Sequence, residues 1–492
     1  MTQTQRTRSQ LYEESEDIGR NVGANPTIGD VIAARFDRRD VLKGALGVAA
    51  ITATIGPLAL AASQEAKAAG SRFKFKEVAA GVDEKHHVAE GYDVRILMRW
   101  GDPILKGAPA FDPMKQSAAA QKLQFGYNND YVGYIPIPGA ANPSQHGLLV
   151  INHEYTNEEL MFPGIGLQDQ KDGFANITAD LVAIEKAAHG GSILEIEREG
   201  GQWAVVPNSQ YARRIDADTP MEITGPAAGH DRLKTKADPT GRRVLGMLNN
   251  CGGAVTPWGT WLTCEENFHG YFGGKLAKDD PRMTSFKRYG VPENSYAWGK
   301  FDERFDVNKE MNEANRFGWI VEIDPFAPAS MPKKRTALGR FKHENAANVI
   351  NKNGQFVVYQ GDDERFEYVF KFVTRGTVDR SNRAANMNLL DDGTLFVAKY
   401  NPDGSGEWLP LVHGQGPLAS AMDSIAKQTL RSTRGSQPIC WALPRWTGRK
   451  TWKLTSSPTK STSFSPTITG ANPRISVLPT RVPTTSSATS SR

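Results

Sequence analysis

Cysteine is scarce in this chain, and the best-known catalytic motifs are missing from it. Three cysteines occur in 492 residues, Cys251, Cys264 and Cys440, which excludes a small scaffold held together by many disulfides. The patterns H-E-x-x-H, G-x-x-x-x-G-K-[ST] and G-x-S-x-G do not occur in residues 70–434. Zinc proteases of the zincin class, P-loop kinases and ordinary serine hydrolases are therefore excluded.

Acidic residues are absent from residues 435–492, which carry eight Lys and Arg. Residues 1–69 carry eight basic and eight acidic side chains. The formal net charge of +5 for the whole chain therefore leaves −3 for residues 70–434. A protein that binds nucleic acid needs a basic face, so we predict no nucleic-acid partner.

Long apolar runs are also few, and the clearest one indicates a leader. Arg38 and Arg39 precede a weakly apolar stretch at 44–62, and an A-x-A cleavage pattern follows at 66–68. The stretch is too short and too polar for a stable membrane anchor. We predict that residues 1–69 are a twin-arginine signal region, that the twin-arginine translocase is a partner, and that the protein is periplasmic or secreted. That pathway carries folded proteins, which favours a metal loaded before export.

What the chain does contain favours an all-β fold. Hydrophobic residues make up 39% of the sequence, and 47 glycines and 29 prolines break it into short apolar segments such as 146–156, 259–266 and 354–373. No strict repeat of about 40 residues marks a WD propeller. We predict a propeller or sandwich at residues 70–434, with a partly helical insertion at 157–189 and a polar, aromatic one at 267–316.

Residues 435–492 differ in composition from the rest. They are rich in Ser, Thr and Pro, and a disordered tail is the ordinary interpretation. A shifted reading frame offers another, since the codons for residues 438–450 can also encode D-L-L-G-A-T-K-M-D-R-P-E. We predict that the chain after about residue 434 is a frameshift product and that the β domain is incomplete at its C-terminal end.

Cys251 and Cys264 have three possible roles. Their separation of 13 residues permits a disulfide. A Cys251 thiolate could instead hold iron or zinc, because Gly252 and Gly253 let the backbone approach an ion closely. The third role is that of a small side chain packed between strands, and it is the one we expect for Cys264.

Carboxylates follow several apolar strands and favour a hard cation such as calcium. Each one taken singly could also be a solvated strand end or part of a salt-bridged turn. His153 and His343 each precede a glutamate, and we expect both to be core histidines. The candidate metal ligands are Glu154, Glu265, Glu266, Glu344, Asp362 and Asp363, and Glu364 lies beside them.

Five motifs together resemble the PhoX-type alkaline phosphatases over about residues 90–430. They are INHEYTN, NNCGGAVTPWGTWLTCEENF, GRFKHENA, GDDERFEYVFKFV and NMNLLDDGTLFVAKYNPDGSGEW. The resemblance implies a six-bladed β-propeller with long loop and short helical insertions. It also implies hydrolysis of small phosphomonoesters at a cluster of two ferric ions and three calcium ions.

The resemblance assigns individual residues as well. It implies that Cys251 bridges the irons, that Glu344 is an iron ligand, and that Glu154 and Glu266 serve the iron–calcium cluster. Dense positive charge stabilises a transferring phosphoryl group and activates an oxygen nucleophile, so no Ser or Cys nucleophile is needed.

The chain departs from the family in its tail. The string M-D-R-P-E of the shifted frame resembles the motif whose Arg contacts phosphate and whose Glu binds metal, but the chain has Gly448, Arg449 and Lys450 there. We therefore assign no catalytic residue and predict impaired activity. A propeller that binds calcium and a ligand or protein partner, without catalysis, is the alternative.

Overall fold

The computed structural model describes residues 78–79, 85–364, 367–401, 405–412 and 475–476. The predicted signal region lies outside this part of the chain, as does the predicted tail apart from residues 475–476. The chain divides into two compact units, and the described residues of the smaller one, 78–79 and 85–96, contain no helix or strand. Every element below belongs to the larger unit. No described helix is both long enough and apolar enough to span a membrane.

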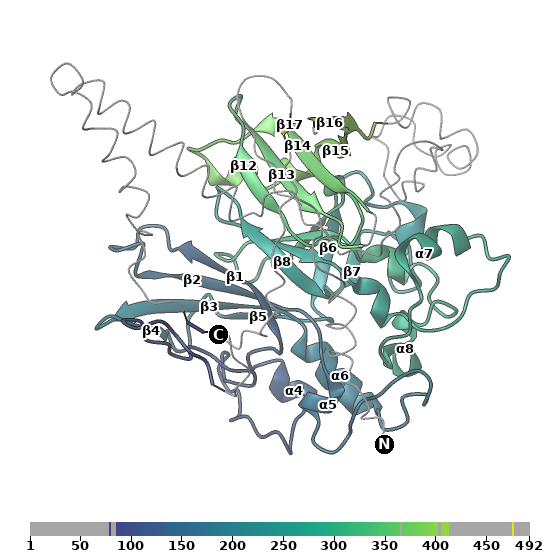
Figure 1. Ribbon diagram of the computed structural model, residues 1–492, viewed down its shortest axis with the longest axis horizontal. Helices are drawn as coiled ribbons and strands as arrows, with labels where there is room; N and C mark the ends of the chain where they lie inside the picture. The colour runs from purple at the N-terminus through teal and green to yellow at the C-terminus, as the bar shows by residue number, and fades with distance from the viewer. Residues whose placement is uncertain (1–77, 80–84, 365–366, 402–404, 413–474, 477–492) are drawn as a thin grey trace, which may run out of the picture. The chain divides into compact units, whose positions relative to one another are not determined.

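The strands of the described residues form three sheets (Figure 1). The first has the order β1 (Asn129–Pro136), β2 (His146–His153), β3 (Gly190–Glu199) and β4 (Gln202–Val205), with β5 (Arg213–Ile215) also paired to β3. The second has the order β7 (Arg243–Leu245), β6 (Pro220–Thr224), β11 (Lys333–Arg335), β10 (Ile320–Ile323), β9 (Trp261–Glu265) and β8 (Asn250–Val255). The third runs from β12 (Ala347–Ile350) through β13 (Gln355–Gly361), β14 (Val369–Thr377), β15 (Gly393–Tyr400) and β16 (Ser405–Pro410) to β17 (Ile475–Ser476). Neighbouring strands are antiparallel except for β6 and β11, and the predicted all-β class is confirmed.

Alternating side chains explain why these segments form strands. In β14, Phe370 and Phe372 are buried while Lys371 and Val373, which point to the other face, are only half-buried. β10 is buried along its whole length, as expected for a strand in the interior of a sheet. The largest apolar cluster joins residues of the first and second sheets with the insertion at 267–316.

The helices are short and lie in the connections. α6 (Ala179–Ala188) is the longest of those described, and Thr178 caps its N-terminus by accepting a hydrogen bond from the backbone N–H of Leu181. The predicted partly helical insertion at 157–189 therefore contains two helices, α5 and α6. The α-helices are α4 (Ala118–Gln121), α5 (Glu158–Met161), α6 (Ala179–Ala188), α7 (Met283–Tyr289) and α8 (Trp298–Phe301). The 3-10 helices are η2 (Asp231–Leu233), η3 (Phe268–Tyr271), η4 (Glu303–Phe305), η5 (Glu313–Arg316), η6 (Thr336–Leu338), η7 (Arg383–Asn386) and η8 (Leu389–Asp391).

Aromatic side chains attach the insertion at 267–316 to α6. Tyr271 and Tyr296 stack with ring centroids 4.6 Å apart, and Trp298 lies 4.7 Å from Tyr271. The indole N–H of Trp298 donates to Glu185 of α6 at 3.0 Å. His189 donates to or accepts from the Tyr271 hydroxyl at 2.9 Å. The insertion is therefore a packed part of the core.

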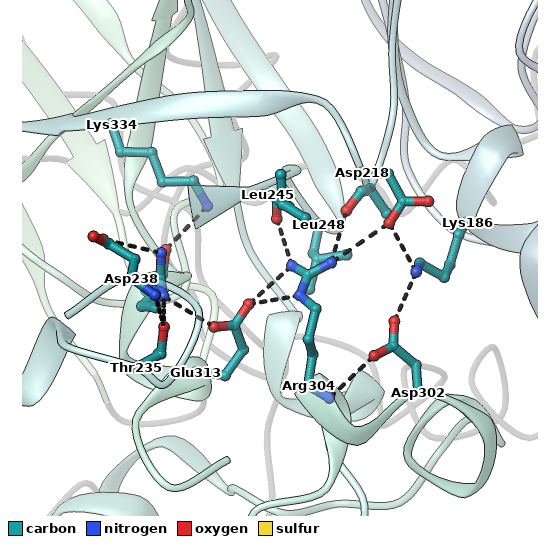
Figure 2. A network of polar contacts seen from close by, with 12 residues as sticks. Lys186, Asp218, Thr235, Asp238, Leu245, Leu248, Asp302, Arg304, Glu313 and Lys334 are labelled. Carbon is teal, nitrogen blue, oxygen red and sulfur yellow. Dashed lines mark hydrogen bonds and ion pairs between the residues drawn. The ribbon is translucent and has the colours of Figure 1, made fainter. Parts of the chain in front are cut away.

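A polar network fixes the far end of the same insertion (Figure 2). The Arg304 guanidinium donates to Glu313 at 2.8 Å and to the carbonyl oxygen of Leu245 at 2.6 Å. Nearby, the ammonium of Lys186 lies 2.7 Å from Asp302. These contacts join the insertion to β7 and α6, and charge-assisted hydrogen bonds of this kind are stronger than neutral ones.

Candidate metal centre

Three possible metal ligands meet where the second and third sheets approach each other. The Cys251 sulfur and one carboxylate oxygen from each of Glu266 and Glu344 all lie within 4.8 Å of one another. Cys251 lies on β8, Glu266 directly follows β9, and Glu344 precedes β12. Cys251 and Glu266 are buried, whereas Glu344 is exposed. Three of the residues predicted from the sequence are thus brought together.

The local backbone explains why Cys251 faces this point. β8 pairs with β9 at Asn250 and again at Gly253, but the register shifts between them. Cys251 and Gly252 both lie opposite the single residue Cys264, which is the arrangement of a β-bulge. A bulge turns a side chain away from the regular direction of its strand. It leaves the Cys251 sulfur 3.2 Å from the carbonyl oxygen of His343.

Gly252 permits this close approach between the sheets. A Cβ atom at position 252 would lie 1.9 Å from the carbonyl oxygen of Glu344. Only glycine fits at such a distance, because real contacts of this kind are much longer. The Cys251 sulfur is also 3.5 Å from the same carbonyl oxygen. Glycine at this position therefore keeps the thiol and Glu344 together.

Further carboxylates surround the three ligand atoms. Burial, followed by repulsion from Asp130, Glu344 and Asp363, raises the pKa of Glu154 well above its usual value. The pKa of Glu266 is raised well above its usual value by burial and by Glu344, Glu154 and Asp363. Carboxylates gathered this closely around the buried Glu266 are stable together only as protonated groups or around positive charge. This is the electrostatic environment of a cation site.

Asp130 is a member of the group that the sequence analysis missed. It lies in β1, and its side chain is hydrogen-bonded to that of Glu154. Burial raises the pKa of Asp130 from its usual value. Its position after Asn128 and Asn129, at the start of an alternating strand, resembles the strand-end carboxylates that we did single out. That signal could have identified it.

The Cys251 thiol is suited to bind a metal ion. Both Cys251 and Cys264 are free and buried, so the disulfide is not formed. Burial and the charges of Glu344, Glu266 and Glu154 raise the pKa of the Cys251 thiol well above its usual value. A bound cation reverses this effect, because a coordinating thiol is deprotonated outright. The donor set of one thiol and several acids therefore fits a metal ion.

Hydrogen bonds hold Glu266 in its orientation. The side-chain amide of Asn267 donates to Glu266 at 2.6 Å, and the backbone N–H of Asn267 donates to the side chain of Asn249 at 2.6 Å. Asn249 has a left-handed backbone, with φ of 49°, which asparagine adopts more readily than most residues. The Asn249 amide also reaches the Tyr271 hydroxyl at 3.4 Å. The aromatic insertion thereby supports the centre.

Glu265, another candidate ligand from the sequence, is not one of these three residues and contacts Lys334 instead. Its side chain is fully buried, and one oxygen lies 2.8 Å from the Lys334 ammonium. The same carboxylate accepts hydrogen bonds from the backbone N–H groups of Leu248 and Trp319 at 3.2 and 3.1 Å. Glu265 is therefore fully engaged in holding strands together and has no orientation left for a metal.

The two adjacent aspartates behave differently from each other. The negative charge of Asp363 raises the pKa of both Glu154 and Glu266, so Asp363 lies near the group. Asp362 is buried beside Arg288, at 3.6 Å, and burial raises its pKa to about 7. Neither aspartate belongs to the set of three ligand atoms within 4.8 Å. We therefore keep Asp363 with the centre and place Asp362 with Arg288.

The neighbouring histidines are core residues. His153 contacts the hydroxyl of Ser192 at 2.7 Å and packs edge-on against Phe125. His343 packs against the Phe341 ring, with centroids 3.7 Å apart. Burial lowers the pKa of both histidines, to about 3 for His343. Both are neutral, as expected for histidines in the core.

Comparison with known proteins identifies the family. The family described as alkaline phosphatase PhoX matches residues 73–474. The chain belongs to the PhoX family. A solved structure, Pseudomonas fluorescens PhoX in complex with vanadate, a transition state analogue, is 45% identical, with a TM-score of 0.64. The match covers 69% of this chain and 59% of the solved chain, so this chain spans about three fifths of that PhoX structure. A search of curated proteins finds no match.

The PhoX match bears on two expectations from the sequence. It confirms the resemblance that the motifs indicated, and it shows a mostly β, propeller-like fold with few helices. The family match also includes residues 435–474, the first part of the predicted tail. The frameshift stays a prediction, because that part of the chain lies outside the described residues.

Proposed function

We propose that this chain is a metal-dependent phosphomonoesterase of the PhoX type that hydrolyses small phosphate monoesters. The observation that carries the proposal is the group of Cys251, Glu266 and Glu344, whose ligand atoms lie within 4.8 Å. The family match and the similarity to a PhoX structure that holds a transition state analogue support the reaction class.

The chemistry of the donor atoms suggests which ions they hold. Cys251, Glu266 and Glu344 would hold iron, because a thiolate favours a transition metal over calcium. Glu154, Asp363 and Asp130 would hold calcium, which prefers carboxylate oxygens. When bound, such cations supply positive charge that stabilises phosphoryl oxygens in the transition state and activates an oxygen nucleophile.

The residues of the chain have their own tasks in this proposal. The buried walls around Cys251 keep water from the thiol, and low local polarity strengthens each charge interaction there. Asn267 orients the Glu266 carboxylate through its side-chain amide. The Lys342 ammonium, bound to Glu364 at 2.6 Å, places a positive charge near Glu266. The family motif with the phosphate-contacting arginine would lie in the tail, where it occurs only in the shifted reading frame. We therefore propose that this chain has impaired activity.

Export completes the proposal. Residues 1–69 carry the twin-arginine pattern and lie outside the described residues. We propose that the translocase of that pathway exports the folded protein and that it functions in the periplasm or outside the cell, without a stable membrane anchor.

Elemental analysis and hydrolysis of an aryl phosphate test the proposal together. We expect iron and calcium in the purified protein. We expect impaired turnover in this chain, and higher turnover that is lost on chelation in a version with the reading frame corrected. Cys251→Ala should lose iron and any visible thiolate-to-iron absorption, whereas Cys264→Ala is the matched control because Cys264 is equally buried but outside the group. Calcium without iron, and no turnover in the corrected version, would favour the non-catalytic calcium-binding alternative.

A further inference from the structure

We propose that Asn152 is a positioning residue for Cys251: its buried side-chain amide holds the β8 bulge in the shape that directs the thiol toward Glu266 and Glu344. This inference rests on the proposed metal centre. Asn152 belongs to β2 in the first sheet and is fully buried. It contacts no ligand atom itself.

The amide of Asn152 bonds both residues of the bulge. Its Nδ2 donates to the carbonyl oxygen of Cys251 in a short hydrogen bond and to that of Gly252 at 3.0 Å. The regular pairing of β8 with β9 is interrupted at these two residues. A bulge disrupts the ladder of backbone hydrogen bonds, and buried carbonyl groups need donors. The two N–H groups of one amide supply them.

Asn152 is itself held in one orientation. Its Oδ1 accepts a hydrogen bond from the Thr263 hydroxyl at 2.8 Å, and that hydroxyl accepts one from the Asn250 amide at 2.9 Å. All three side chains are fully buried. The Thr263 contact therefore fixes which end of the Asn152 amide faces β8. Through these hydrogen bonds, Asn152 of the first sheet holds the β8 backbone of the second sheet in one conformation.

The direction of a side chain follows from the backbone that carries it. With both carbonyl groups of the bulge fixed, the Cα–Cβ bond of Cys251 has one direction, and it brings the sulfur to Glu266 and Glu344. Without the amide, the buried carbonyl group of Cys251 and the partly buried one of Gly252 lose this donor, and the bulge can relax toward regular pairing with β9. We expect the thiol to turn away while the surrounding sheets stay assembled.

Another asparagine provides a matched control. Asn348 also donates its amide to a carbonyl oxygen of β8, that of Val255, at 3.2 Å. Val255 lies at the opposite end of the strand from the bulge. Asn348→Ala removes a contact of the same chemical kind and leaves the bulge intact.

Binding of Co²⁺ to the metal-stripped full chain tests the inference, since thiolate-bound Co²⁺ has a distinctive absorption band. We expect Asn152→Ala to lower the affinity about tenfold and to weaken the band per bound ion, with Asn348→Ala staying within about twofold of wild type. Asn152→Asp has nearly the same shape and keeps the Thr263 contact, but its carboxylate cannot donate to the two carbonyl groups. It should reproduce the loss with a native circular dichroism spectrum.

The outcomes separate this inference from the proposed centre. If wild type gives no thiolate band with Co²⁺, the metal centre is wrong and the role of Asn152 falls with it. If wild type gives the band and both Asn152 variants keep its intensity and affinity within twofold, the centre stands and the positioning role of Asn152 is overturned.

Discussion

Lys334 and Glu265 form an ion pair in which neither side chain is exposed, with 2.8 Å between the ammonium nitrogen and a carboxylate oxygen. Burial lowers the pKa of Lys334 to about 8 and raises the pKa of Glu265. Both pKa shifts show that burial disfavours the charged form of each residue. The opposite charge of the partner offsets part of this cost. The pair fixes the end of β9, the strand that leads into Glu266.

Breaking this pair should destabilise the protein strongly. Lys334→Met leaves Glu265 charged and buried, and we expect the free energy of unfolding to fall by about 3–5 kcal/mol. The double variant Lys334→Met with Glu265→Gln should recover part of that loss, because it removes the buried charge, although the single oxygen of glutamine can accept from only one of the Leu248 and Trp319 N–H groups. Chemical unfolding measures both, and equal losses in the single and double variants would contradict this account.

Gly252 should tolerate no side chain. Because the new Cβ in Gly252→Ala would lie 1.9 Å from the Glu344 carbonyl oxygen, we expect a loss of stability of about 1–3 kcal/mol and a drop in metal content. Gly361→Ala is the control, since a Cβ there would meet only the Cβ of Glu344 at 4.0 Å. Unfolding midpoints and elemental analysis compare them, and a Gly252→Ala protein with normal metal content would show that the close approach is dispensable.

Removing one carboxylate from the centre should have opposite effects on stability and on metal binding. The pKa of Glu266 is raised, so below that pKa the folded state keeps a proton that the unfolded chain releases near pH 4.5. The metal-free protein should therefore lose stability as the pH rises above about 4.5.

Glu266→Gln should flatten this dependence and raise the melting temperature of the metal-free protein at neutral pH, while it weakens metal binding. Glu199→Gln, at an exposed position, should change neither. Thermal unfolding with and without metal measures both changes. If metal-free Glu266→Gln protein melts at a lower temperature than metal-free wild type, Glu266 is not destabilised by its neighbouring carboxylates.

Lys371 should titrate unusually early for a lysine. Burial between the Phe396 and Trp408 rings lowers its pKa to about 8. Between pH 8 and about 10.5 the unfolded chain then binds a proton that the folded state has released, so stability gains a contribution that grows as the pH rises. Lys371→Met should remove this slope. Lys399→Met, on the next strand, should keep it, and identical slopes in wild type and Lys371→Met would disprove the shift.

The sequence predicted the all-β class because that class depends on local patterns, and the family resemblance pointed to three residues that the structure brings together. Short apolar strands ending in acids were visible, and the motifs around Cys251, Glu266 and Glu344 were specific. Glu265, which the sequence also suggested as a ligand, lies outside the group of three and pairs with Lys334. Successive residues at the end of a strand point to opposite faces, so Glu265 and Glu266 could not both face the centre.

Other features depend on residues far apart in the chain. Lys334, which neutralises Glu265, is 69 residues away from it, and Asn152 is 99 residues from Cys251. No periodicity in a single sequence reports such contacts. Asp130, at the start of β1, carried a local signal like that of the other strand-end acids, but its contact with Glu154 is another feature that only the structure shows.

The β8 bulge is part of the second sheet, whereas Glu344 precedes β12 of the third sheet and is 93 residues from Cys251 in the sequence. If the proposed centre binds an ion, it can do so with all three ligands only after both segments have been translated and have come together. Metal uptake would then act as a checkpoint on maturation, so that an empty centre marks a molecule still being assembled.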